Sequence, residues 1–377
     1  MANKKTILSE EIELSDIVLK KTNQAFEMIK QEDIVCMKKT HTRGKKMFKT
    51  QVAVIAGVCI LAISSISAVA AIHHHWGRGM NGIIQASDEQ QQVLTEKNIA
   101  KVYSEEPDSP SLAVTNNGVT IEPDTVIVDE RFVYMTFRIS GYSVADKMEP
   151  GFDMVNVYQG DNPEDESARV NMSGTMYDGI ISDENGTPVD EEGSIISHYT
   201  DDNGNMEYII QASAAEKNDS LLGKTIHVEF KNLGTFSKGT FIPAVDGNWN
   251  FEVNLSDVSS TQNIKVGKKV EGTGFTIEDI NISPISIEVN YSVSVAPMEK
   301  EDDLGIPEVK GVVLKDGTKI PYLINPGRLG YADSSKSNAY QIAGFTRVID
   351  ADEIVALIVW KSYKNEKVEM LEIPISK

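Results

Sequence analysis

The residues whose side chains could carry chemistry are few and scattered in this sequence. Three adjacent histidines, His73 to His75, could ligate a transition metal, but neighbours on a helix point in different directions and no further ligand lies near them. The two cysteines, Cys36 and Cys59, are isolated as well. The motifs of P-loop proteins, serine hydrolases and zinc proteases do not occur. We therefore expect no enzyme, no catalytic residues, no metal site and no cofactor.

Two acidic stretches resemble calcium-binding loops in composition, Asp183 to Glu192 and Asp201 to Asn205. Neither has glycine at its sixth position and glutamate at its twelfth, which the calcium loop of an EF-hand requires. Solvated turns are the simpler interpretation of both.

The clearest binding pattern lies near the N-terminus, where residues 9 to 31 are predicted to form an amphipathic helix. At 100° per residue, one apolar stripe collects the candidate partner-binding residues Val18, Leu19, Thr22, Ala25, Phe26 and Ile29. Lys20 and Gln24 lie on the opposite face. A segment this short has no core of its own, so the stripe requires a protein partner or a membrane surface. Glu10, Glu11 and Glu13 favour a protein partner over anionic lipid.

The element that positions this helix is a predicted transmembrane span. Residues 52 to 72 contain no charged residue, and a helix of that length just crosses the hydrocarbon core of a bilayer. Lysines and one arginine cluster on its N-terminal side, which predicts a cytoplasmic N-terminus. A cleaved signal peptide is the alternative, because Ala68 and Ala70 form a small-x-small site. The fifty residues before the apolar run are far longer than the n-region of a signal peptide.

The charge differs on the two sides of this span. Residues 1–50 hold 11 basic and 7 acidic residues, whereas residues 73–377 hold 25 and 49. An exterior with a net charge of −24 argues against nucleic acid as a partner. Because the exterior has no cysteine, its domains must depend on hydrophobic cores rather than disulfides.

Beyond residue 111 the apolar residues alternate with polar ones, which predicts half-buried β-strands. Clear examples are Val133 to Ile139 and Ile285 to Val295, and in the second of these Ser286 and Glu288 are expected to face solvent. The predicted organisation is a cytoplasmic segment at 1–51, the span at 52–72, a juxtamembrane linker at 73–111 and two tandem β-sandwich-like domains at 112–257 and 263–377. The fold class is therefore mainly β, with one amphipathic helix and one transmembrane helix. Trp76 is expected to anchor the outer end of the span in the membrane interface.

Three short stretches resemble a family of Firmicute single-pass membrane proteins typified by the negative effector of the sigma-M factor. They are Asn117 to Ile121, Leu222 to Val228 and Gly247 to Phe251. The second domain resembles the immunoglobulin-like β domain that often follows in such proteins. The resemblance implies an anti-sigma role, in which the cytoplasmic helix holds an extracytoplasmic-function sigma factor at the cell membrane and the exterior senses the envelope.

Two functions thus remain open. One is an anti-sigma-like regulator whose partners are a sigma factor, membrane lipid and an extracellular ligand or co-regulator. The other is a surface adhesin or wall-binding protein without a regulatory tail. The apolar stripe separates them, because an adhesin does not need one.

Overall fold

A computed structural model describes residues 76–103, 112–144, 148–160, 170–179, 197–214, 217, 219–294, 305–325, 327–362 and 368–375. The predicted amphipathic helix at 9–31 and the predicted span at 52–72 lie outside these residues. Within the described ranges, no helix is long and apolar enough to cross a membrane.

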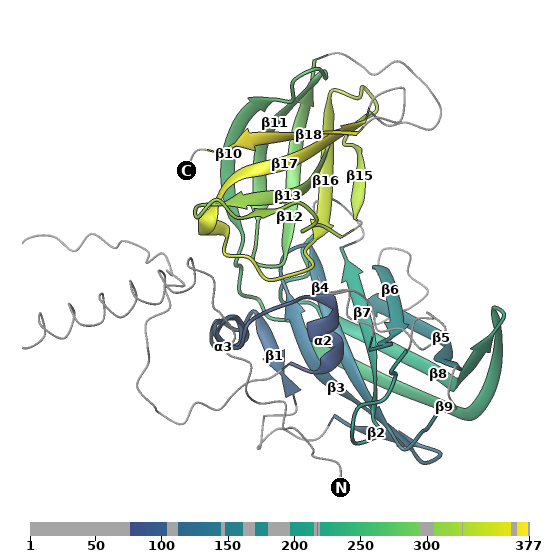
Figure 1. Ribbon diagram of the computed structural model, residues 1–377. Coiled ribbons are helices and arrows are strands. Elements are labelled where there is room, and N and C mark those ends of the chain that lie inside the picture. Colours follow the sequence, from purple (N-terminus) through teal and green to yellow (C-terminus); the bar gives the residue numbers. More distant parts are fainter. Residues whose placement is uncertain are drawn as a thin grey trace, which may run out of the picture. The chain divides into compact units, whose positions relative to one another are not determined.

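Strands dominate the described residues, so the expectation of a mainly β chain is confirmed (Figure 1). Two α-helices precede them, Arg78–Ile83 (α2) and Asp88–Glu96 (α3). The strands up to residue 254 are Ala100–Val102 (β1), Val114–Asn116 (β2), Val119–Val128 (β3), Phe132–Ser140 (β4), Glu149–Gln159 (β5), Asn171–Met176 (β6), Met206–Ser213 (β7), Thr225–Ser237 (β8) and Thr240–Asn254 (β9). The later ones are Gln262–Lys269 (β10), Phe275–Ile282 (β11), Ser286–Val293 (β12), Glu308–Leu314 (β13), Lys319–Ile320 (β14), Arg328–Tyr331 (β15), Asn338–Gly344 (β16), Ile354–Ser362 (β17) and Val368–Pro374 (β18).

Strands β1 to β9 form two antiparallel sheets, which we call the first module. One sheet has the order β1-β3-β4-β7-β6, with β2 also paired to β3, and the other has the order β5-β8-β9. Apolar side chains from the inner faces of both sheets form one core. At its centre Trp249 is fully buried and donates from Nε1 to the carbonyl of Val119 at 3.1 Å, so this core joins β9 to β3.

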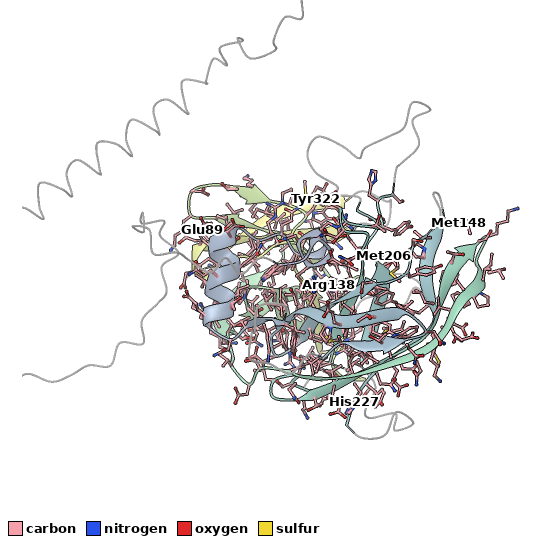
Figure 2. The ribbon with its side chains drawn as sticks, turned by 90° about the horizontal axis from the view of Figure 1, so that it is seen from below. Glu89, Arg138, Met148, Met206, His227 and Tyr322 are labelled. Carbon is pink, nitrogen blue, oxygen red and sulfur yellow. The ribbon has the colours of Figure 1, made fainter. Side chains whose placement is uncertain are left out.

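The outer face of the β5-β8-β9 sheet is polar. His227, labelled in Figure 2, lies on this face. Its ring stacks on that of Tyr158, with the two ring centres 5.0 Å apart. The Tyr158 hydroxyl donates to Glu229 at 3.1 Å. This alternation of apolar inner and polar outer residues is the pattern expected of a sheet with one solvated side.

Strands β10 to β18 form the second module, with sheet orders β10-β11-β12-β16-β15 and β14-β13-β17-β18. Its core is separate from that of the first module. Along β12, Ile287, Val289 and Tyr291 face this core as the alternation predicts. The prediction that Ser286 and Glu288 face solvent is wrong, because each is only 4% exposed and contacts the first module.

The residues before β2 differ most from the sequence prediction. Residues 76–102, expected to belong to a juxtamembrane linker, contain α2, α3 and β1 and share a third apolar cluster with both modules. Trp76 is only 4% exposed inside this cluster, so it is a core residue rather than an exposed membrane anchor. We call residues 76–102 the strap; its last element, β1, is also an edge strand of the first module.

Candidate functional site: the docked strap

The six residues of the predicted partner-binding stripe, from Val18 to Ile29, lie outside the described residues. Among the residues that the structure does describe, the most specific arrangement of polar groups is the place where the strap docks. No group of three or more His, Cys, Asp or Glu side chains suited to a metal occurs in those residues. The docking site consists of carboxylates that accept hydrogen bonds from main-chain N–H groups.

A carboxylate from β7 holds the start of α2. Glu207 accepts from the Arg78 N–H at 3.1 Å and from the Gly79 N–H at 2.6 Å. The first N–H groups of a helix have no partner within the helix, and Gly77 supplies no side-chain cap. Glu207 thus caps α2 from a strand 128 residues further along the chain, and α2 lies against β4 and β7.

A second carboxylate, Asp124 on β3, lies beside the first. It accepts from the Thr125 hydroxyl at 2.9 Å and the Thr136 hydroxyl at 3.3 Å, and also from the Gly77 N–H. A Cβ placed on Gly77 would lie 2.7 Å from Asp124 Oδ2 and 2.8 Å from Glu207 Oε2. The two oxygens are therefore at most about 5.5 Å apart, the sum of these distances.

Glycine is required in the strap because its backbone lies directly on these groups. A Cβ on Gly79 would be 2.8 Å from Glu207 Oε2, and one on Gly82 would be 2.3 Å from the Tyr177 ring. With Gly77, these residues form the pattern G-x-G-x-x-G, whose first two glycines often allow a backbone to approach an anion. Here the anions are carboxylates of the protein itself.

Burial dominates the electrostatics of the carboxylate pair. It raises the pKa of Asp124 and the pKa of Glu207, and the charge of Asp124 raises the pKa of Glu207 further. Arg78 opposes this shift, since its Nε lies 3.8 Å from Glu207 Oε1. The Arg78 guanidinium also lies 5.2 Å from the Tyr177 ring centre and donates to the carbonyl of Tyr199 at 3.2 Å.

Side-chain amides tie the two helices of the strap together. Gln91 on α3 accepts from the Trp76 N–H at 2.9 Å and donates to the Asn81 side chain at 3.0 Å. Asn81 donates in turn to the carbonyl of Trp76 at 3.1 Å. Ser87 caps α3 in a reciprocal capping box with Gln90. These bonds fix the strap as one unit.

The strap also binds the second module through main-chain groups. The Gln85 N–H donates to the carbonyl of Thr346 at 2.9 Å, and the Val348 N–H donates to the carbonyl of Gln85 at 2.8 Å. The Gln90 side chain donates to the carbonyl of Val348 at 3.2 Å. Ile285 of the second module belongs to the same apolar cluster as Trp76. A single segment thus contacts both modules.

The two modules meet directly at a joint beside the strap. Asp129, at the end of β3, is fully buried and accepts from the hydroxyls of Ser283 and Ser286 in the second module, each at 2.5 Å. Burial raises the pKa of Asp129. Arg131 pairs with Glu288 at 2.9 Å, and this glutamate is also buried. The joint is therefore polar and closely fitted.

Close packing extends the joint to β4. The Tyr134 hydroxyl lies so near Gly344 of the second module that a Cβ there would be 2.1 Å from it. The same hydroxyl donates to the carbonyl of Phe345 at 3.5 Å. Residues 255–261 form the connector between the modules, and Glu130 accepts hydrogen bonds from Ser259 and Thr261 in it.

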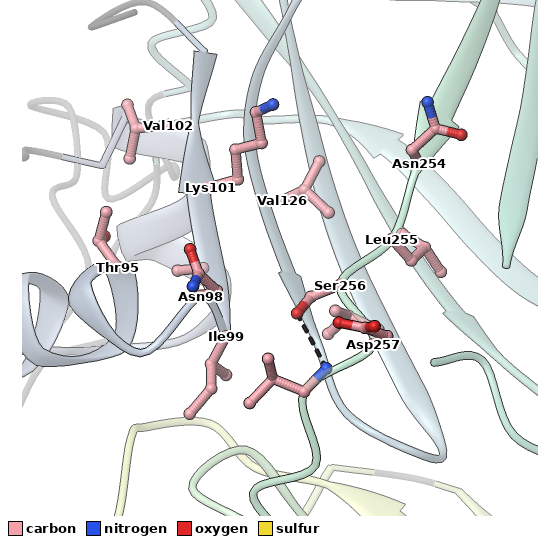
Figure 3. A pocket seen from close by; sticks show the side chains of 13 residues that line it. Thr95, Asn98, Ile99, Lys101, Val102, Val126, Asn254, Leu255, Ser256 and Asp257 are labelled. Atoms are coloured by element: carbon pink, nitrogen blue, oxygen red, sulfur yellow. Dashed lines mark hydrogen bonds between the residues drawn. The ribbon is translucent and has the colours of Figure 1, made fainter. Parts of the chain in front are cut away.

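A pocket of about 400 Å³ lies between the strap and the connector (Figure 3). Its apolar lining comes from Ile99 and β1 of the strap, from β3 and from the connector, and Lys101 and Asp257 are its charged residues. The Val258 N–H donates to the Ser256 hydroxyl at 3.1 Å at one end. The residues that line it are Thr95, Asn98–Val102, Val126, Val128 and Asn254–Val258.

One sequence pattern could have indicated the strap, and it is a helical spacing rather than the alternation of strands. Trp76, Met80 and Ile84 recur every four residues, which places them on one side of a helical turn, and all three are buried. No sequence pattern indicated Asp124 and Glu207, the partners of residues 77–79, because acidic residues are frequent throughout residues 73–377.

Comparison with known proteins does not identify a family for this chain. No family model matches the sequence. No curated protein matches it either. One solved structure, the crystal structure of the conserved domain protein from Bacillus anthracis, covers 72% of this chain and 88% of its own, with 14% identity and a TM-score of 0.42. The comparisons therefore assign neither a family nor a function to this chain.

Proposed function

We propose that the chain is a membrane-anchored, anti-sigma-like regulator of the kind that the sequence resembles. Its cytoplasmic helix, residues 9–31, would hold an extracytoplasmic-function sigma factor. The exterior modules would sense the state of the envelope, and the span at 52–72 would join the two. The N-terminus is then cytoplasmic and both modules are extracellular.

The observation that supports this proposal most is the position of the strap. Its first described residue, Trp76, follows the last residue of the predicted span, Ile72, by four positions. A protein that only displays an adhesive domain gains nothing from folding its membrane-proximal residues into both modules. A regulator does, because a change in the modules then reaches the span without a long linker between them.

The decisive experiment concerns the apolar stripe. In the predicted helix Phe26 and Ile29 would lie one turn apart, and loss of each side chain from a buried interface should cost about 2 kcal/mol or more of binding free energy. Phe26→Ala with Ile29→Ala should release the sigma factor and induce its genes. Lys20→Ala with Gln24→Ala, on the opposite face, should leave transcription unchanged.

Transcript levels are to be measured at equal protein abundance and membrane insertion, because loss of the chain would imitate release. In parallel, residues 1–50 serve as bait for a sigma factor. If the bait captures none, and the double variant transcribes normally, the regulator proposal fails and a surface adhesin or wall-binding protein takes its place.

A further inference from the structure

The strap is a segment that cannot hold its structure alone. Helix α2 has only six residues, two of which are glycine, and glycine lowers helix stability by about 1 kcal/mol relative to alanine. Its main-chain cap comes from Glu207 and its apolar side chains are buried against other elements. The docked state of the strap therefore depends on the surfaces that receive it.

Those surfaces belong to different modules. Residues 77–79 of the strap bind Asp124 and Glu207 of the first module, whereas Gln85 binds Thr346 and Val348 of the second. Both surfaces are available together only while the modules are held in one arrangement. The joint at Asp129 provides that arrangement, since its carboxylate binds both modules at once.

We infer that the strap is a two-module lock: parting of the modules at the Asp129 joint releases the strap, and this release is the event that the regulator transmits. The inference rests on the proposed function and specifies its regulation. A ligand that binds the separated modules more tightly than the joined modules would shift the equilibrium from the docked strap to the free strap.

A disulfide tests the lock directly because the exterior contains no cysteine. Gln85 and Arg347 are bridge partners, and neighbouring residues in a bridge lie within the Cα separation of about 4.4 to 6.8 Å that disulfides adopt. Gln85→Cys with Arg347→Cys in the full-length chain should fix the strap to the second module. Disulfide formation is followed by the shift in mobility on a non-reducing gel.

With the disulfide formed, envelope stress should no longer induce the regulon, and a membrane-impermeant reductant should restore induction. The matched control is Asn263→Cys with Asn281→Cys, which joins β10 to β11 within the second module and crosses no joint. Each single cysteine variant should respond as the parent does. Normal induction with the Gln85–Arg347 disulfide intact would overturn the inference.

The opposite perturbation weakens the joint. Ser286→Ala removes one donor to the buried Asp129 carboxylate and should weaken the joint between the modules. In the full-length chain in membrane vesicles, amide hydrogen exchange of residues 76–102 should then become about tenfold faster. Exchange in β8 and β9 reports whether the first module remains folded. Unchanged exchange in the strap would contradict the inference, and general unfolding would leave the disulfide to decide it.

The two proposals can fail separately. If the Phe26 and Ile29 variant induces the regulon but the locked chain still responds to stress, only the lock is wrong. If that variant has no effect, the proposed function fails, and the exchange measurement alone then judges whether the joint controls the strap.

Discussion

Glycine at position 79 lets the strap reach Glu207, and two effects of replacing it oppose each other. Alanine favours helix by about 1 kcal/mol, but its Cβ would lie 2.8 Å from Glu207 Oε2 and 3.2 Å from Ile209. The carboxylate would have to move and lose its bond to the Gly79 N–H. We expect Gly79→Ala to lower the free energy of unfolding of residues 73–377 by about 1 to 2 kcal/mol net.

Urea unfolding of residues 73–377 measures this change. Gly330→Ala is the matched control, because its Cβ would meet no atom closer than 3.6 Å and its φ is not in the left-handed region. That control should be neutral or slightly stabilising. A Gly79→Ala variant as stable as the control would show that Glu207 does not constrain the strap.

Three buried carboxylates should make the stability of the two modules increase with falling pH, as the signs of their pKa shifts show. Burial raises the pKa of Asp124, Asp129 and Glu207 above that of unfolded carboxylates, which is about 4. Such groups bind more protons in the folded state, so their contribution is complete below the unfolded pKa and is lost as pH rises through the folded pKa. The free energy of unfolding should therefore increase as pH falls from neutral towards about 5.

Chemical denaturation across this range measures the slope. Asp129→Asn should flatten it, whereas Asp257→Asn, at an exposed carboxylate, should not. Other carboxylates act in the opposite direction at lower pH: hydrogen bonds from Ser335 lower the pKa of Asp333 to about 2, so its contribution disappears only in stronger acid. A stability that falls steadily from pH 7 to pH 5 would contradict the role given to the buried groups.

At the scale of elements, alternation predicted strands wherever one face meets a core. β4 and β12 follow this rule at Val133 and Ile287, and the mainly β class followed from it. The rule failed at Ser286 and Glu288 because the outer face of β12 meets another module at that end. Periodicity reports that a face is polar, but it does not report whether water or a second polar surface covers it.

The first helix of the strap, α2, escaped prediction for a different reason. A six-residue helix with two glycines has little intrinsic tendency to form, and tertiary contacts with residues more than 120 positions away decide its structure. Single-sequence patterns are local, so Gln85 offered no sign of its pairing with Thr346. For the same reason, local patterns did not predict that Asp124 and Glu207 lie side by side at the strap.

At the scale of the two modules together, the strap and the Asp129 joint that they share predict that both modules unfold in one transition. Each module has its own core, yet a third apolar cluster contains residues from both. Burying Trp76, Met80 and Ile84 contributes about 1.5 to 3 kcal/mol each, part of which is lost when the modules separate.

We expect residues 73–377 to unfold in one transition, and chains cleaved in the connector near Ser259 to remain associated during size-exclusion chromatography. Asp129→Ala leaves Ser283 and Ser286 without their acceptor, so cleaved chains of this variant should dissociate more readily. Two separate transitions, or halves that part at once after cleavage of the parent, would show that the modules are independent.

The long reach of the strap also sets an order in which the exterior can be completed. In the proposed topology, the strap is the first exterior segment to leave the membrane during export. Its partner Glu207 follows 128 residues after Gly79, and Val348 follows 258 residues after Gln90. Met80, whose helix lies against β4 and β7, therefore stays uncovered until β7 has crossed, and the Gln90 side chain lacks its acceptor until Val348 has crossed. If export stops before Val348, the second-module groups that bind Gln85 and Gln90 are missing. In the proposed topology an undocked strap would therefore also indicate a chain whose export is incomplete.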